Sequence, residues 1–251
     1  SRGISLRSVW LHQAYHEITS KYKRTFFGSI WVAASVMATS LALAIVIGGI
    51  QGQPISVVLP YVMSGIMAFS LCGYILNEAA EVFMASSNTI KNHAHPFSYY
   101  IFESLSRSFF IFLHNLIPFY LMLILVRSFE IPHWSIVFGL FAVYCVSFFW
   151  GTLAAMLGAR FRDLRFMLPF LGQMLFFLTP VFWMPTNFSN WRQGIIDYNP
   201  FYGLVEVVRS PMLGKAAPDV AWIQCGLMLA AGLMLWLVFF GTMRRKIAFW
   251  I

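Results

Sequence analysis

Long apolar runs separated by short polar connections dominate the pattern along the 251-residue chain. A helix needs about 20 apolar residues to cross a hydrocarbon core of ~30 Å. The runs that reach or approach this length lie at about 26–50, 55–84, 97–126, 134–159, 166–184 and 220–243. Apolar residues are continuous within each run rather than alternating, which argues against a transmembrane β-barrel. We therefore predict an all-α integral membrane protein with six transmembrane helices in a single domain over 26–251.

The first 25 residues are polar but follow a helical pattern. Apolar positions recur every three, four or seven residues, so they fall on one helix face. These positions are Ile4, Leu11, Tyr15, Ile18 and Tyr22. The pattern predicts an amphipathic helix over 1–25 that lies in the membrane interface. An ordinary surface helix is the alternative.

The connection at 185–219 differs from the others because charged and aromatic residues are interleaved in it. After Asn199-Pro200, apolar residues such as Leu204 and Val208 favour a short amphipathic helix. Non-helical backbone at membrane depth is tolerated only where protein or a wet cavity covers it. We therefore predict two short re-entrant helices that dip back into the outer leaflet between spans five and six.

Composition and charge support a membrane location. Hydrophobic residues make up 59% of the chain and charged residues 10%, whereas a soluble domain has about 25% charged residues. With both termini in the cytoplasm, only Arg127, Arg192, Arg209 and Lys215 of the 17 lysines and arginines fall on outer connections. Positive charge concentrates on the cytoplasmic side of membrane proteins. We therefore predict a multi-pass protein of the inner (cytoplasmic) membrane, and the net charge of +8 needs no nucleic-acid partner.

Two polar cytoplasmic connections are suited to contact another protein. The turn at 160–165 holds three arginines and one aspartate between two nearly uncharged runs. An ionised side chain at the membrane centre costs about 2.5–3.5 kcal/mol even on lenient scales, so this turn must lie at the membrane surface. The connection at 86–96 is long for two helices, and we expect it to have structure of its own. The alternative for the arginine turn is that it only fixes the topology.

The chain contains none of the short motifs that would give it chemistry of its own. It has no Gly-x-x-x-x-Gly-Lys-Ser/Thr phosphate-binding loop, no His-Glu-x-x-His zinc helix and no Gly-x-Ser-x-Gly nucleophile motif. His93 and His95 are close together, but no third metal ligand accompanies them. We predict no catalytic residue, no metal site and no cofactor bound by this chain.

Several short motifs occur in a characteristic order. They are Asn88, Ile90 and Lys91 after the second span, Phe161-Arg162-Asp163 after the fourth, and Thr179-Pro180-Val181, Asn199-Pro200, Glu206 and Arg209 around the outer segment. Together they resemble the permease subunits of type-2 ABC transporters. The most similar branch exports polysaccharides and polyol phosphates, such as O-antigen, capsule and teichoic acid. One departure is that Trp31 in the first span is not followed by the proline that this family often has.

The resemblance implies a homodimer of six-span subunits, surrounded by membrane lipids and docked to two copies of a cytoplasmic ABC ATPase. The ATPase would bind ATP and Mg²⁺, and a lipid-linked glycan would pass through a channel between the subunits. The family makes its main ATPase contact between the second and third spans, and the arginine turn is a second candidate. The coupling candidates are Asn88, Ile90, Lys91, Asn92, Arg160, Phe161, Arg162 and Asp163.

Aromatic residues make up 18% of the chain, and their faces suit the C–H surfaces of sugar rings. The channel-lining candidates, on the fifth span, are Phe176, Phe177, Phe182 and Trp183. Helix packing and interfacial aromatic belts are the alternative. The candidates for an outer gate are Tyr198, Asn199, Pro200, Glu206 and Arg209.

Two other functions fit part of the pattern. Exporters of drugs or small lipids often carry a large outer domain after the first span, whereas residues 51–54 form a tight turn. A membrane-embedded enzyme of lipid-linked sugar metabolism would need acidic or histidine residues that converge at one membrane face. The candidates for such a site are Glu78, Glu81, Glu103, His93 and His95. Glu103 also precedes Arg107 by four residues, the favourable order for a pair on one helix.

Overall fold

The computed structural model describes residues 9–14, 30–92, 95–184, 194 and 196–251. In this part of the chain the regular structure is helical, without strands, and five helices are long and apolar enough to cross a membrane. They are α3 (Ile30–Gln51), α4 (Ile55–Cys72), α8 (Phe97–Leu125), α9 (Ile136–Arg160) and α13 (Asp219–Met243). A shorter apolar helix, α10 (Leu164–Leu178), takes the place of the predicted fifth span. The prediction of an all-α multi-pass membrane protein is thus confirmed.

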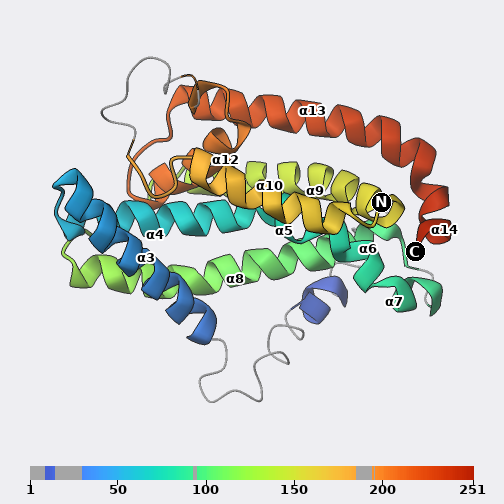
Figure 1. The fold of residues 1–251 in the computed structure, drawn as a ribbon, viewed down its shortest axis with the longest axis horizontal. Coiled ribbons are helices and arrows are strands. Elements are labelled where there is room, and N and C mark those ends of the chain that lie inside the picture. Colours follow the sequence, from blue (N-terminus) through green and yellow to red (C-terminus); the bar gives the residue numbers. More distant parts are fainter. Residues whose placement is uncertain (1–8, 15–29, 93–94, 185–193, 195) are drawn as a thin grey trace.

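The helices form an elongated bundle whose spans run back and forth between two ends (Figure 1). One end carries α7 (Ser87–Asn92), the turn between α9 and α10, and α14 (Ile247–Trp250). The other carries the turn between α3 and α4, the turn between α8 and α9, and α12 (Pro200–Met212). The connections that the charge pattern assigns to the cytoplasm therefore meet at one end. We refer to it as the inner end and to the opposite one as the outer end.

The second span is not the single helix over 55–84 that the apolar pattern suggests. After α4 the chain continues as α5 (Tyr74–Asn77), the 3₁₀ turn η1 (Ala79–Glu81) and α6 (Val82–Ala85). Glu78 interrupts the helical backbone with φ −122° and ψ −37°. The interrupted segment packs closely on α9, because a Cβ atom at Gly158 would lie only 2.1 Å from the Ala80 carbonyl oxygen. The small residues Ala80 and Gly158 thus allow the backbone of the interrupted segment to cross close to that of α9.

The fifth span is a shorter helix than predicted. α10 has 15 residues and is about 22 Å long, against a hydrocarbon core of ~30 Å. It ends at Thr179, which precedes Pro180 and has an extended backbone with ψ 139°, as residues before proline prefer. Thr179, Pro180 and Val181 are all buried. The chain after α10 is therefore non-helical backbone covered by protein, the setting in which such backbone is tolerated.

The outer segment contains α12, which packs against α4, α9 and α13. The Asn199 side chain caps this helix by accepting a hydrogen bond from the Phe201 N–H at 3.0 Å. Pro200 occupies the first turn, where its missing N–H costs nothing. The position of α12 agrees with the second of the two predicted re-entrant helices. Most of the first predicted helix falls in 185–193, outside the described residues.

The N-terminal amphipathic helix also lies mostly outside the described residues. Within them, 9–14 are helical, and the Trp10 ring stacks on Phe102 of α8 with 5.4 Å between centroids. Tyr99 donates a hydrogen bond to the Gln13 side chain at 3.2 Å. This short helix therefore packs against the inner half of α8, and its position in the membrane interface stays a prediction.

A serine compensates for the proline inside α4. Pro60 has no N–H, so the Ser56 carbonyl lacks its usual helical partner. Ser128, in the turn after α8, donates a hydrogen bond to this carbonyl at 2.8 Å. This bond explains how a buried span keeps a proline, because a neighbouring side chain satisfies the backbone group that proline frees.

Candidate functional site

A buried ion pair lies at the outer end, where α12 meets α4 and the chain after α10. Arg209 has 2% of its surface exposed and pairs with Glu206, one turn earlier in α12. Ser210 donates a hydrogen bond to the other carboxylate oxygen at 2.5 Å. Arg209 also donates to the Pro180 carbonyl, and its guanidinium lies 4.1 Å from the centroid of the Tyr61 ring. We name these five residues the outer clamp.

Each nitrogen of Arg209 and each carboxylate oxygen of Glu206 in the outer clamp forms a hydrogen bond. A buried charge is costly unless it is paired and its remaining donors and acceptors are satisfied. Three nitrogens of Arg209 donate hydrogen bonds, and both oxygens of Glu206 accept them. Burial alone would lower the pKa of Arg209, but the Glu206 carboxylate more than offsets this effect, so the pKa lies above its ordinary value. Arg209 therefore stays charged.

Tyr61 extends the clamp to the non-helical chain after α10. Its hydroxyl lies within hydrogen-bond distance of two carbonyl oxygens, that of Pro180 at 3.0 Å and that of Trp183 at 3.2 Å. Gly65, one turn further along α4, allows the Val181 carbonyl to approach, since a Cβ atom there would lie 2.3 Å from that oxygen. One face of α4 thus fixes the path of this segment.

The predicted gate residues divide into a connected set and an exposed one. Glu206 and Arg209 belong to the outer clamp. Asn199 joins the same region because its side-chain amide donates a hydrogen bond to the Thr179 hydroxyl at 2.9 Å. Tyr198, by contrast, is 89% exposed. The connected residues hold the end of α10 against the start of α12, and their role as a gate stays a prediction.

The predicted channel-lining aromatics cluster at the outer end of α10. The Phe176 ring lies 5.6 Å from both Phe177 and Phe182, centroid to centroid. It also meets Phe69 of α4 edge-on at 5.2 Å. The Trp183 indole donates to the Phe177 carbonyl at 3.1 Å. Phe176 is therefore partly a core residue, and Phe177, which is 58% exposed, is the better candidate for a channel surface.

At the inner end, α7 carries one set of predicted coupling residues. Asn88, Lys91 and Asn92 are exposed, and α7 has no buried residue. Ile90 is half-buried and packs against the hydrophobic cluster that contains Phe83. α7 is thus a short helix anchored by one apolar side chain, and its polar side chains are accessible to a partner protein.

The turn between α9 and α10 carries the second set at the same end. Arg160 is the last residue of α9, and its guanidinium lies 5.6 Å from the Phe161 ring centroid and 6.0 Å from that of Trp250. Arg162 and Asp163 are exposed. Both sets of coupling candidates are therefore accessible from the inner end of the bundle (Figure 1).

A polar cavity of about 300 Å³ lies beside the break in the second span. Glu78 at this break pairs with Arg107 of α8 at 3.4 Å and accepts a hydrogen bond from Ser108 at 3.3 Å. Glu81 and Glu103 also line the cavity. Helical spacing predicted Glu103 beside Arg107, and the structure adds Glu78. The contact between Glu78 and Arg107 could not be predicted from the sequence, because it depends on where the helix of the second span is interrupted.

Sequence reasoning missed two members of the outer clamp. Ser210 lies four residues after Glu206, a spacing that places both on one face of α12 and could have revealed the contact. Tyr61 gave no such signal, because its partners lie more than 100 residues away in the chain.

The described residues contain no group of three or more histidine, cysteine or acidic side chains arranged to hold a metal ion. His93, one of the two neighbouring histidines, lies outside them. In both polar regions the charged side chains fix helices in place. In the outer clamp Arg209 bonds to a carboxylate and to a backbone carbonyl, and beside Glu78 the hydrogen bonds join side chains.

Comparison with known proteins identifies the family. A family model described as ABC-2 type transporter matches residues 14–213. This range includes α7, the turn between α9 and α10, and the outer clamp. A comparison with curated proteins gives no match. Because the family match covers most of the chain, the protein belongs to the ABC-2 type transporter family.

Proposed function

We propose that this permease is the channel-forming subunit of an ATP-driven exporter of a lipid-linked polysaccharide across the cytoplasmic membrane. As an ABC-2 family member it is a transport subunit, and such subunits pair with an ABC ATPase. The chain has no phosphate-binding loop, so ATP and Mg²⁺ would bind to that partner. The main support for the proposal is the family match. The matched residues include α7 and the turn between α9 and α10, the two polar elements at the inner end.

The short outer connection after the first span supports a polysaccharide substrate. Only residues 52–54 separate α3 from α4. Gly52 adopts a positive φ of 64° there, and the Gln53 N–H bonds to the Gly48 carbonyl at 3.0 Å. This turn leaves no room for the outer domain that drug and small-lipid exporters often carry at this position. The exposed ring of Phe177 adds a surface on which a sugar could stack.

An exposed face of α10 supports a homodimer. Gly172 is the one buried residue of this helix, whereas Phe166 and Phe170 expose 68% and 62% of their surfaces. A second copy that places its own α10 opposite would form a two-fold interface, the commonest arrangement among homo-oligomers. The channel would then lie between the two copies, and each copy would dock one ATPase subunit.

The alternative of a membrane-embedded enzyme has less support. Glu78, Glu81 and Glu103 do line one cavity, as that alternative requires. However, Glu78 already binds Arg107 and Ser108, and the family is one of transport subunits. We therefore assign the cavity to the positioning of the helices that lead to α7.

Affinity capture from native membranes tests the partner. We expect an ATPase with Walker motifs to co-purify with the detergent-solubilised protein. Lys91→Glu should reduce its capture severalfold because the substitution reverses a charge on the exposed side of α7. Lys215→Glu makes the same reversal at an exposed site of the outer end and should have no effect. Recovery of a folded dimer without any ATPase would contradict the proposal.

Reconstitution of the complex in liposomes tests the substrate. We expect a lipid-linked glycan to stimulate ATP hydrolysis, and short-chain lipids or hydrophobic drugs to have no effect. If only the small compounds stimulate hydrolysis, the protein exports small molecules instead.

A further inference from the structure

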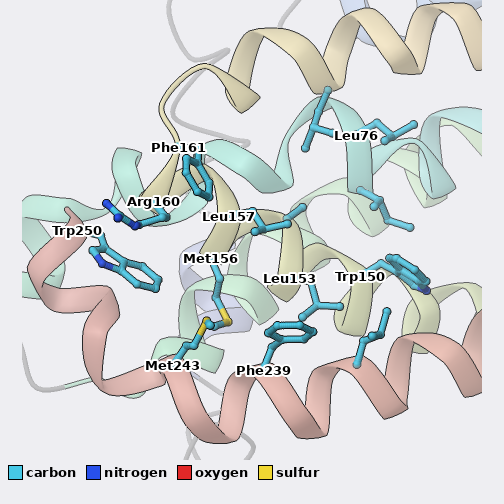
Figure 2. A pocket seen from close by; sticks show the side chains of 14 residues that line it. Leu76, Trp150, Leu153, Met156, Leu157, Arg160, Phe161, Phe239, Met243 and Trp250 are labelled. Carbon is cyan, nitrogen blue, oxygen red and sulfur yellow. The ribbon is translucent and has the colours of Figure 1, made fainter.

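An apolar groove of about 510 Å³ runs along the inner half of the bundle, between α9, α10 and α13. Its volume lies within the range of roughly 300–1,000 Å³ that is usual for ligand pockets. Figure 2 shows the side chains that line it, with Trp150 toward one end, Phe239 near the middle, and Arg160 and Trp250 at the other end. The lining is aliphatic, aromatic or thioether except for Arg160. Such a surface suits a hydrocarbon chain, which forms no hydrogen bonds.

The length and direction of the groove match one leaflet of a membrane. Trp150 and Arg160 both line it and lie ten residues apart on α9, which is about 15 Å along a helix. One leaflet provides half of a hydrocarbon core of ~30 Å, or about 15 Å. The groove therefore extends from the cytoplasmic interface to near the midplane, the space that the acyl chain of an inner-leaflet lipid occupies.

The inner mouth of the groove carries positive charge. Within the described residues the Arg160 guanidinium forms no ion pair, and its recorded contacts are the Phe161 and Trp250 rings. Arg244, which directly follows the lining residue Met243, is exposed at the end of α13. Lys246 is also exposed at this end. Arg162 lies outside the lining of the groove and directly precedes the exposed Asp163 carboxylate in the sequence. A tryptophan and cations at this level are typical of the interface with lipid headgroups.

We propose that an anionic phospholipid of the cytoplasmic leaflet binds in this groove. One acyl chain lies between α9 and α13, and the phosphate pairs with Arg160. The apolar lining accommodates the acyl chain of the lipid. The positive charge at the mouth favours an anionic headgroup over a zwitterionic one. A lipid held there contacts three helices at once, so it would brace the turn between α9 and α10.

Native mass spectrometry of the full-length protein in detergent micelles tests the proposal with dioleoylphosphatidylglycerol and dioleoylphosphatidylcholine. We expect the wild type to retain phosphatidylglycerol preferentially. Arg160→Gln should weaken this binding about fivefold, the effect of roughly one charge at a membrane surface. Arg162→Gln removes the same charge from the same turn without touching the groove, and it should bind nearly as wild type does.

A second variant separates the groove from the surface charge. Leu157 lines the groove and is half exposed, so Leu157→Trp should fill the groove without overpacking the core. We expect this variant to lose retention of both lipids. Three results would each overturn the proposal. The wild type could bind the two lipids equally, Arg160→Gln and Arg162→Gln could lose binding equally, or Leu157→Trp could bind as the wild type does.

Two other occupants of the groove give different results. A polyprenyl phosphate that displaces phosphatidylglycerol at equal concentration would identify the groove as part of the substrate path, and would overturn the assignment to a structural lipid. Loss of the homodimer in Leu157→Trp would show that a second copy of the chain covers the groove, and would also overturn it. This proposal does not depend on the transported substrate, so its failure would leave the exporter assignment intact.

Discussion

Removal of the arginine from the outer clamp should strongly destabilise the folded permease. In Arg209→Met, the Glu206 carboxylate would keep its hydrogen bond from Ser210 but lose its cationic partner. The Pro180 carbonyl would lose one donor, although the Tyr61 hydroxyl would still reach it. Removing one partner of a buried ion pair costs about 3–5 kcal/mol. The equilibrium constant for unfolding should therefore rise roughly 150- to 4,000-fold.

Two of the three cysteines provide the assay. Cys72 and Cys225 are buried and unpaired, so a thiol-reactive dye should label them only after unfolding. A titration with sodium dodecyl sulfate in mixed micelles, followed by this labelling, gives the free energy of unfolding. Lys215→Met removes an exposed cation near the same end, and it should change that free energy by less than about 0.5 kcal/mol.

A double variant shows whether the unpaired charge is the cause. Glu206→Leu combined with Arg209→Met removes both charges, and replacing a buried pair with apolar side chains is often neutral or stabilising. The double variant should therefore be more stable than Arg209→Met alone. If Arg209→Met unfolds at the wild-type detergent concentration, the pair is not buried as described. If the double variant is as unstable as the single one, lost packing rather than an unpaired charge explains the effect.

Two further predictions use the same unfolding assay. Gly158→Ala should lower the free energy of unfolding by about 1–3 kcal/mol through overpacking, because its Cβ would meet the Ala80 carbonyl. The control is Gly226→Ala, whose Cβ would meet nothing within 4 Å, and it should be neutral or stabilising. Equal effects of the two substitutions would contradict the described contact. Ser128→Ala should cost about 1–3 kcal/mol because it leaves the carbonyl freed by Pro60 without a partner. Pro60→Ala should reduce that cost by restoring the helical N–H, and no such rescue would refute this account.

The positions of the long helices could be predicted from the sequence. α8, α9 and α13 begin and end within two residues of the predicted spans. Each follows an apolar run that closes with polar or charged residues at a membrane surface, so local composition alone sets the boundaries. The short helix after Asn199-Pro200 was also predictable, because an N-cap residue followed by proline marks a helix start.

The interruptions of the spans could not be predicted in the same way. The apolar pattern continues through Glu78 as far as Met84, and through Thr179 as far as Met184. In both places the α-helix ends near a carbonyl that packs against a glycine of another helix, the Ala80 carbonyl against Gly158 and the Val181 carbonyl against Gly65. These contacts join residues far apart in the chain. The candidate site was predictable only in part for the same reason, since Tyr61 acquires its role through the fold.

α4 connects the two polar regions along the chain and in space. It is the most buried of the five long helices, with 67% of its most apolar stretch inside the protein, compared with 17% for α3 and α13. Its outer half carries Tyr61 and Gly65, which hold the chain after α10. Its inner end leads through the break at Glu78, which Arg107 ties to α8, into α7. A packed helix moves largely as a rigid body, so we expect any displacement of the segment that leads to α7 to reach the outer clamp through α4. The outer clamp would open only if this displacement moved the chain after α10 away from Arg209 and broke the hydrogen bond to the Pro180 carbonyl.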